Sequence, residues 1–426
     1  MTAPTAAGPR ATAWLVLLPG IAALATVMGI GRFVYTPILP EMLSGGVLNL
    51  REAGWVASAN FVGYLVGAMA ASAVRTRPWQ SRLARLGLVL TPLMLAAMAL
   101  TTSLPVWLAV RFAAGVASAL ALVFVSAQVL ERLVQVGAAQ RLVWLFSGVA
   151  LGIIVAALLA LAGQPFGLDW RGLWWVAAAL SASLSRVAWR ALDAPAAPSA
   201  PHGAATAPGA ALPPSAPAWT SPPGRGTRLE FQVTVLAYGL FGLGYVIHAT
   251  YLPAMVRVAG YPQSAALWIW VLVGMAALPS MLLWSAVARR FGARSAVAAC
   301  YATQGLSALT PVVTDSIGGA AVAAVGLGGT FVAVTGIALA YVRSLEPERS
   351  ARAIGLMTAA FGVGQIVGPL AAAYLAEASF AGANGFVWPS VLACAALLGA
   401  TALMLAGCNN RSRRADRPGA PRRASQ

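Results

Sequence analysis

Three side chains that can carry a charge lie well inside long apolar stretches of this sequence. Arg32 and Arg111 each supply a guanidinium, and His248 supplies an imidazole, the group that most readily exchanges protons near neutral pH. An arginine within a lipid bilayer costs about 2.5 to 3.5 kcal/mol even on the scale from insertion experiments, so each is a candidate functional residue. Two guanidinium forks at one site would bind a carboxylate or phosphate through paired hydrogen bonds, which predicts an anionic ligand.

Carboxylates are missing from the middle of the apolar stretches. The acids that flank a stretch lie mostly at one end of it, and these are Glu41, Glu52, Asp169, Asp315 and Glu377; Glu131 lies at the other end, and the rest lie in connecting segments. A proton-coupled exporter of cations usually needs a buried carboxylate for which proton and cation compete. The pattern disfavours that class and leaves Glu41 and His248 as candidates to carry a coupling proton.

Two interpretations stay open for each buried polar residue. Arg32 and Arg111 either bind a ligand or hold carbonyl groups of neighbouring helices, and His248 either lines a cavity or packs within a bundle. Asn60 and Gln365 either face a cavity or form hydrogen bonds between helices.

Several classes of chemistry find no support in the sequence. All 28 basic residues are arginine, so neither a phosphate-binding loop with its lysine nor a lysine Schiff base is expected. The three cysteines, Cys300, Cys394 and Cys408, have no metal-binding or disulfide spacing. With no nucleophile, metal cluster or carboxylate pair at either membrane face, we expect neither an enzyme, nor a cofactor, nor a metal site.

The elements that must position these residues are membrane-spanning helices. The sequence is 59% hydrophobic and 9% charged, whereas soluble domains carry roughly a quarter of charged residues. About 20 apolar residues cross a hydrocarbon core of about 30 Å. Twelve such stretches are predicted, at residues 14–40, 52–74, 85–103, 105–130, 142–163, 170–190, 231–256, 264–288, 295–314, 317–342, 353–376 and 385–407.

The second six stretches repeat the first six. GIGRFVYTPILPEM at 29–42 returns as GLGYVIHATYLPAM at 242–255, an offset of 213 residues that still relates Gly115 to Gly328. At the fifth stretch the offset slips by one, because Gly152 matches Gly364. A parallel duplication of an apolar chain is typical of secondary transporters with a binding site between the repeats.

The arginines are distributed unevenly over the two sides of the membrane. Twenty-three of them lie in the N-terminus, the even-numbered connections and the C-terminus. The positive-inside rule places that side, and both termini, in the cytoplasm. The net charge of +17 is therefore interpreted as topology and contact with anionic headgroups, and no binding of nucleic acid is expected.

Composition also predicts the boundaries of the parts. Residues 191–229 hold nine prolines and twelve alanines and are interpreted as a cytoplasmic linker that forms no core. The expected parts are an N-terminal six-helix bundle at 1–190, this linker, a C-terminal six-helix bundle at 230–407, and a basic cytoplasmic tail at 408–426.

Over residues 14–407 the chain resembles the major facilitator superfamily. ARRFGAR at 288–294 is similar to the loop signature A-D-R-x-G-x-R, although Arg289 stands where the aspartate belongs, and RFAAG at 111–115 is similar to the R-x-x-x-G motif of the fourth helix. The resemblance implies two six-helix bundles related by a pseudo-two-fold axis, with spans 1, 4, 7 and 10 lining a cavity. It also implies a cytoplasmic gate formed by Arg289, Arg290, Gly292 and Arg294.

More specifically, GIGRFVYTPILPEM at 29–42 and MTAAFGVGQIVGP at 357–369 resemble the YbfB/YjiJ-type bacterial permeases. This resemblance implies a transporter without specifying its substrate. Because the repeat aligns His248 with Tyr35 and Arg32 with Tyr245, each pair is expected to face across the cavity. The expected substrate-binding residues are Arg32, Tyr35, Asn60, Arg111, Tyr245, His248 and Gln365.

The sequence thus predicts a secondary active transporter of the bacterial inner membrane that moves a small anionic or polar organic solute by alternating access. It is expected to be monomeric, embedded in the bilayer, with a proton as the candidate coupling ion. Two alternatives remain open: a multidrug-type exporter of apolar compounds, and a non-transporting membrane sensor or partner-binding protein on the same fold.

Overall fold

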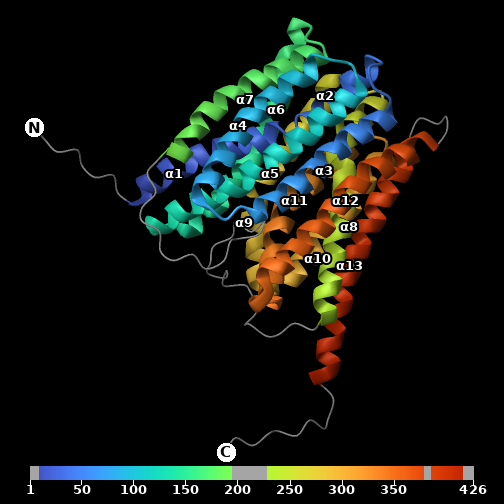
Figure 1. Ribbon diagram of the computed structural model, residues 1–426. Coiled ribbons are helices and arrows are strands. Elements are labelled where there is room, and N and C mark those ends of the chain that lie inside the picture. Colours follow the sequence, from blue (N-terminus) through green and yellow to red (C-terminus); the bar gives the residue numbers. More distant parts are fainter. Residues whose placement is uncertain (1–8, 194–227, 379–384, 416–426) are drawn as a thin grey trace, which may run out of the picture.

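The computed structural model describes residues 9–193, 228–378 and 385–415 of this 426-residue protein. Every regular element in these ranges is a helix, and the long helices form two bundles of six, one from each half of the chain (Figure 1). The predicted all-α membrane fold is confirmed. The predicted linker and basic tail fall largely outside the described residues.

The N-terminal bundle begins with a span that is broken into three pieces. These are α1 (Pro9–Leu24), a π-helical turn η1 (Ala25–Ile30) and α2 (Tyr35–Ser44). The other five spans are α3 (Leu50–Ala73), α4 (Arg77–Ala99), α5 (Leu104–Gln135), α6 (Ser147–Gly163) and α7 (Trp170–Asp193), with 3-10 turns η2 (Ala139–Phe146) and η3 (Gln164–Phe166) on either side of α6.

The C-terminal bundle repeats this order with a continuous first helix. Its spans are α8 (Arg228–Val258), α9 (Gln263–Phe291), α10 (Ala293–Val313), α11 (Ile317–Leu345), α12 (Ser350–Ala378) and α13 (Val387–Ala415), and the 3-10 turn η4 (Pro347–Arg349) precedes α12. The predicted spans were therefore mostly too short at their ends, because the helices continue beyond the apolar stretches.

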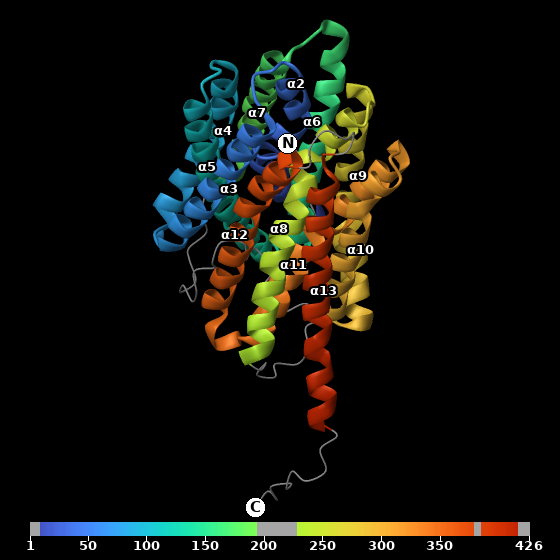
Figure 2. The same cartoon turned by 90° about the vertical axis from the view of Figure 1, so that its right-hand side faces the viewer.

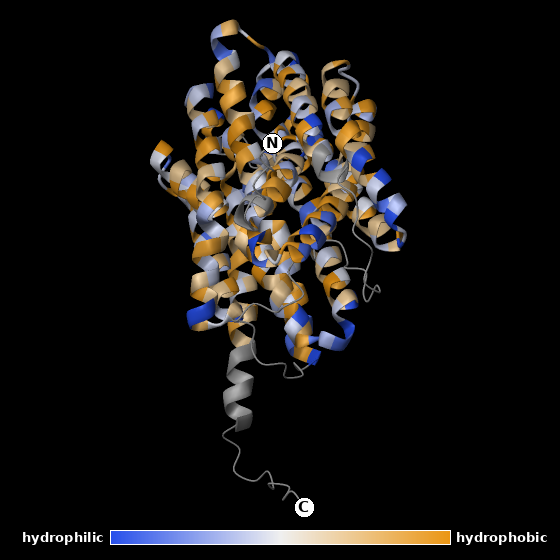
Figure 3. Cartoon of the chain, turned by 90° about the vertical axis from the view of Figure 1, so that its left-hand side faces the viewer, coloured by the Kyte–Doolittle hydropathy of each residue, from blue (hydrophilic) through white to orange (hydrophobic). Residues whose placement is uncertain are grey.

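Eleven helical segments of the described residues have the length and apolar composition needed to cross a membrane. The predicted twelfth, α7, is long enough at 24 residues, but Arg171, Arg186 and its serines make it more polar than the others. It nevertheless packs against α4 and α1 as a member of the N-terminal bundle. Large apolar side chains remain exposed around both bundles, as expected for a surface that meets lipid (Figure 3).

Small residues bring the helices of each bundle into close contact, and they do so at equivalent positions of the repeat. A side-chain carbon added at Gly115 would lie 2.1 Å from the carbonyl oxygen of Asn60, and one added at Gly328 would lie 2.0 Å from that of Val273. Both glycines and both carbonyls are related by the same 213-residue offset. The duplication seen in the sequence is thus also a duplication of helix contacts.

The two bundles meet at the face opposite the chain ends. We call the face where α1 begins, α7 ends and α8 begins the terminal face. At the other end of the spans, Thr36 Oγ1 donates to the carbonyl oxygen of Ala249 at 2.7 Å. These residues are 213 positions apart, so the pseudo-two-fold axis passes close to this contact.

Other contacts between the bundles lie on the same opposite face. Arg51, at the start of α3, forms an ion pair of 2.6 Å with Glu377 near the end of α12. The α3–α12 and α6–α9 pairs provide the most extensive packing between the halves. From this contact the bundles diverge toward the terminal face (Figure 1).

Candidate functional site

Arg32 lies at the break in the first span, in the turn between η1 and α2. Its side chain is 5% exposed, and its guanidinium lies over the rings of Phe61 and Tyr64 on α3, 4.7 and 4.4 Å from their centroids. Two of its nitrogens, Nε and Nη2, are buried without a hydrogen-bond partner among the described residues. The aromatic faces stabilise the cation, but two strong donors remain unused.

The C-terminal bundle completes the surroundings of Arg32. Tyr245 on α8 interacts electrostatically with the Arg32 guanidinium, and its hydroxyl accepts a hydrogen bond from Gln365 Nε2 on α12. The Tyr245 ring stacks on Phe361 and on Phe331, with centroids 5.5 and 6.3 Å away. The structure therefore brings together Arg32, Tyr245 and Gln365 from the predicted set, at the interface between the two halves. We call these three residues and the aromatic rings around them the Arg32 group.

Arg111 lies next to this group but is oriented differently. Its Nη1 donates to the carbonyl oxygen of Gly31 at 3.3 Å and its Nη2 to that of Arg32 at 3.4 Å. These carbonyls lie at the break of the first span, where regular helical bonds are interrupted. Asn60 in turn donates to the carbonyl oxygen of Arg111 at 3.0 Å. This arrangement links α3, α5 and the broken span through backbone groups.

His248 and Tyr35 do not face each other, contrary to the expectation from the repeat. The Tyr35 hydroxyl donates to the carbonyl oxygen of Ala53 at 3.0 Å, and the ring packs against Trp174 within the N-terminal bundle. His248 lies among α8, α10, α11 and α13, next to Gln304 and Ser307, in a small void of the C-terminal bundle. Tyr35 thus has its hydrogen bond and ring contacts with α3, α5 and α7 of the N-terminal half, including the Arg111 guanidinium at 5.1 Å from its ring centroid, whereas His248 is enclosed by helices of the C-terminal half.

The two candidates for carrying a coupling proton differ in burial and in position. His248 is buried, and its Nε2 has no hydrogen-bond partner among the described residues. Glu41 is only partly buried, on the last turn of α2 at the face opposite the chain ends.

The predicted gate motif has one residue with a defined set of partners. Arg289 and Arg290 end α9 as exposed side chains, and Gly292 adopts a positive φ of 85° in the turn to α10. Arg294, by contrast, donates to the carbonyl oxygen of Met404 at 2.5 Å and forms an ion pair of 3.3 Å with Glu230.

Glu230 was not predicted as an important residue. It begins α8, is 5% exposed, and accepts a hydrogen bond of 2.6 Å from the Tyr341 hydroxyl as well as from Arg294. Arg294 of the loop motif thus has an acidic partner on another helix, α8. In the sequence, Glu230 is marked only by its position directly before an apolar stretch. A carboxylate at that position is also common at solvated helix ends, so it does not indicate a buried ion pair.

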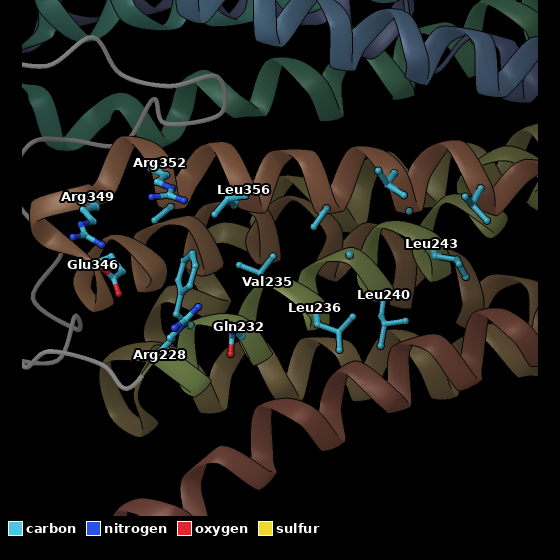
Figure 4. A pocket seen from close by; sticks show the side chains of 17 residues that line it. Arg228, Gln232, Val235, Leu236, Leu240, Leu243, Glu346, Arg349, Arg352 and Leu356 are labelled. Carbon is cyan, nitrogen blue, oxygen red and sulfur yellow. The ribbon is translucent and has the colours of Figure 1, made fainter.

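A large cavity lies apart from all of the predicted site residues. It has a volume of about 1050 Å³ and is formed by α8, α12 and the turn that precedes α12 (Figure 4). The group around Arg32 is instead tightly packed, with aromatic rings from both halves in contact. Among the described residues, no three histidine, cysteine or acidic side chains gather as a metal site would require.

The Arg32 group contains a buried cation with two unused hydrogen-bond donors, Nε and Nη2. Such donors can bind a carboxylate or phosphate.

A family model described as an uncharacterised MFS-type transporter, YbfB, matches residues 24–408. The chain belongs to this family. The resemblance to YbfB-type permeases and the predicted major facilitator fold are thereby confirmed.

Solved structures with the same fold are transporters as well. The chain is similar to the nucleoside transporter NupG, solved as a mutant, with 16% identity, a TM-score of 0.65, and coverage of 92% of this chain and 99% of that one. It is also similar to a bacterial homologue of the human lysosomal transporter Spinster, solved in an inward-facing, unoccupied conformation. That match has 14% identity, a TM-score of 0.63, and coverage of 97% and 100%.

At these identities the likeness concerns the fold alone. A search among curated proteins finds no match. Family and fold together identify the chain as a secondary transporter that spans the membrane several times.

Proposed function

We propose that the transporter moves a small organic anion, or a polar solute with an anionic group, and that Arg32 binds that group. The observation that carries this proposal is the pair of buried, unpartnered nitrogens on Arg32 at the interface between the halves. A planar carboxylate or phosphate would accept two hydrogen bonds from one edge of the guanidinium. Such an ion would also compensate a charge that no carboxylate neutralises among the described residues.

Alternating access fits the way the halves are packed. The Thr36–Ala249 hydrogen bond and the Arg51–Glu377 ion pair join the halves at one face, and the Arg32 group lies between that face and the diverging ends of the bundles. If the bundles rock about this group, the contacts on the first face would open as the terminal ends approach each other. The break at Arg32 would then lie close to the centre of the motion.

A multidrug-type exporter of apolar compounds is the second candidate. Its support is the run of stacked rings beside Arg32, in which Phe361 contacts Tyr238, Phe241 and Tyr245 with centroids 4.8 to 5.6 Å away. Aromatic rings bind apolar and cationic drugs without specific hydrogen bonds. A cationic drug, however, would have to enter beside an uncompensated guanidinium.

A thermal-shift screen of the purified transporter distinguishes these candidates. Organic acids, phosphate esters, neutral sugars and cationic drugs are compared at matched concentrations. A ligand at about 100 times its Kd stabilises the folded state by about 2.7 kcal/mol, which is large enough to detect. We expect stabilisation by anions; stabilisation by cationic drugs alone would favour the exporter and refute the anion proposal.

We further propose that the terminal face is cytoplasmic, in the inner membrane of a bacterium, and that residues 191–229 act as a cytoplasmic linker. The arginine excess on that face supports this orientation. Reporter enzymes that work only in the cytoplasm or only in the periplasm, fused within 194–227, test it. Activity of the periplasmic reporter would reverse the topology.

A further inference from the structure

The large cavity is a groove on the outside of the C-terminal bundle. Figure 2 shows α8 between α12 and α13 on one outer surface of the molecule, and α8 packs against both helices. Leu236 and Val363, which line the groove, are 56% and 55% exposed. On α12, the side chains of Phe361 and Gln365 point away from the groove, toward Tyr245. The groove therefore opens sideways, toward the surrounding lipid, and is separate from the Arg32 group.

The groove is lined mainly by apolar residues. Its lining combines leucine and valine side chains with glycine and alanine residues of α8 and α12. Gly364 allows the helices to approach, because a side-chain carbon there would lie 2.2 Å from the carbonyl oxygen of Gly239. A flexible hydrocarbon chain fits a surface of this shape without polar contacts.

The end of the groove at the terminal face is charged. Arg228, Arg349 and Arg352 surround it, and Glu346 is the one acid in its lining (Figure 4). No ion pair joins these three arginines to a carboxylate in the described part of the chain. The local excess is thus positive, and guanidinium groups bind phosphate oxygens in pairs.

The length of the groove matches one leaflet of a bilayer. Along α8 it runs from Arg228 to Leu243, which is about 22 Å at a rise of about 1.5 Å per residue. Half of a bilayer, headgroups included, is about 20 to 22 Å thick. A phospholipid with its headgroup among the arginines would place its acyl chains along the apolar walls.

We propose that this groove is a binding site for an anionic phospholipid. The phosphate of the lipid is held by Arg349 and Arg352, with Arg228 on the opposite wall, and one acyl chain lies between α8 and α12. The segment 194–227 is a weaker candidate for the occupant, because it contains no acidic residue that would complement the arginines. A basic pocket between helices at the membrane surface is a known arrangement for anionic headgroups.

The proposed lipid site shares two helices with the Arg32 group. The groove is formed by α8 and α12, and these helices also carry Tyr245 and Gln365 of the Arg32 group. A bound lipid would contact both helices on the side that faces away from the Arg32 group. We therefore expect the lipid to stabilise the C-terminal bundle whether or not the Arg32 group binds an anion.

Photo-crosslinking in vesicles tests the proposal directly. The full-length transporter is reconstituted in phosphatidylcholine vesicles that contain a small fraction of phosphatidylglycerol with a photoactivatable acyl chain, and adducts are mapped by peptide mass spectrometry. We expect adducts concentrated on residues 235–243 and 356–367, reduced by unlabelled phosphatidylglycerol and unaffected by added phosphatidylcholine. Arg349→Gln with Arg352→Gln should reduce this labelling about thirtyfold, since each basic side chain near the surface contributes about 1 kcal/mol to the attraction of an anionic headgroup.

A matched double variant in the other half controls for the loss of charge. Arg75→Gln with Arg82→Gln removes two exposed arginines from the same face and should leave labelling unchanged. Labelling spread equally over the lipid-facing helices of both halves, or equal competition by phosphatidylcholine, would overturn the proposal. A rise in groove labelling after deletion of residues 200–220 would show that the linker occupies the groove and would also overturn it.

Discussion

Arg32→Lys is expected to fold, reach the membrane and bind the strongest anionic hit of the ligand screen about ten- to a hundredfold more weakly than the wild-type transporter. The guanidinium has two unused nitrogens on adjacent positions, whereas an ammonium offers a single point of charge. A hydrogen bond between charged groups contributes about 1.5 to 3 kcal/mol, so the loss of one accounts for this range. Arg32→Ala should abolish binding. Both results are read by titration calorimetry on purified protein.

Arg111→Lys is the matched control, because it makes the same chemical change on a neighbouring helix. Arg111 donates to the carbonyl oxygens of Gly31 and Arg32, so its replacement should lower thermal stability and leave the affinity of the folded fraction nearly unchanged. Equal losses of affinity in the two lysine variants would place both arginines on the ligand. If Arg32→Ala loses stability yet binds with wild-type affinity, Arg32 serves only to hold the helix and the anion proposal fails.

The repeat in the sequence predicted the arrangement of the bundles in some detail. Residues related by an offset of 213 occupy equivalent helix contacts, as with Gly115 and Gly328, and the hydrogen bond between Thr36 and Ala249 joins two such residues directly. This was predictable because small residues at helix crossings cannot be enlarged without moving a backbone. The slip of one residue is also retained, since Gly29 packs on Gly152 and Gly242 packs close to Gly364.

The direction of individual side chains was less predictable. A residue near the pseudo-two-fold axis faces its equivalent only if it lies on the interfacial side of its helix, and one position along a helix rotates a side chain by about 100°. Thr36 forms a hydrogen bond with the other half, whereas Tyr35 forms one within its own half and His248 packs within its own half. The first span is broken at residues 25–34, although its sequence closely matches that of the continuous α8.

Glu230 could not be identified from the sequence for a different reason. Its partners, Arg294 and Tyr341, lie 64 and 111 residues away along the chain. Nothing in their local sequences marks them as a group, and only the packing of α8, α10 and α11 brings them together. The missing aspartate at position 289 therefore does not mean that the loop motif lacks an ion pair, because Arg294 pairs with Glu230 on another helix.

Glu230→Ala is expected to destabilise the transporter by about 3 to 5 kcal/mol, the usual cost of leaving a buried charge without its partner. The side chains of Arg294 and Glu230 are only 15% and 6% exposed, and the Tyr341 hydroxyl would also lose its acceptor. Glu230→Gln retains an acceptor and should cost less. The measurement is the midpoint of thermal unfolding in detergent, followed by tryptophan fluorescence at one fixed heating rate.

Glu377→Ala tests whether the burial of an ion pair or the distance between its charged atoms determines its contribution to stability. The Arg51–Glu377 pair is shorter, at 2.6 Å against 3.3 Å, but its side chains are 54% and 30% exposed. Exposed pairs contribute about 0 to 1 kcal/mol, so this change should barely move the midpoint. If it lowers the midpoint as much as Glu230→Ala does, the argument from burial is wrong.

A second change in the Glu230→Ala background identifies the cause of the loss. Arg294→Met removes the orphaned guanidinium and keeps most of the volume of the side chain, so the double variant should regain part of the lost stability. Without such recovery, the loss would have to come from the Tyr341 contact or from the packing at the start of α8. With such recovery, the loss in Glu230→Ala comes from the orphaned Arg294 charge, and the buried pair is what joins the ends of α8 and α10.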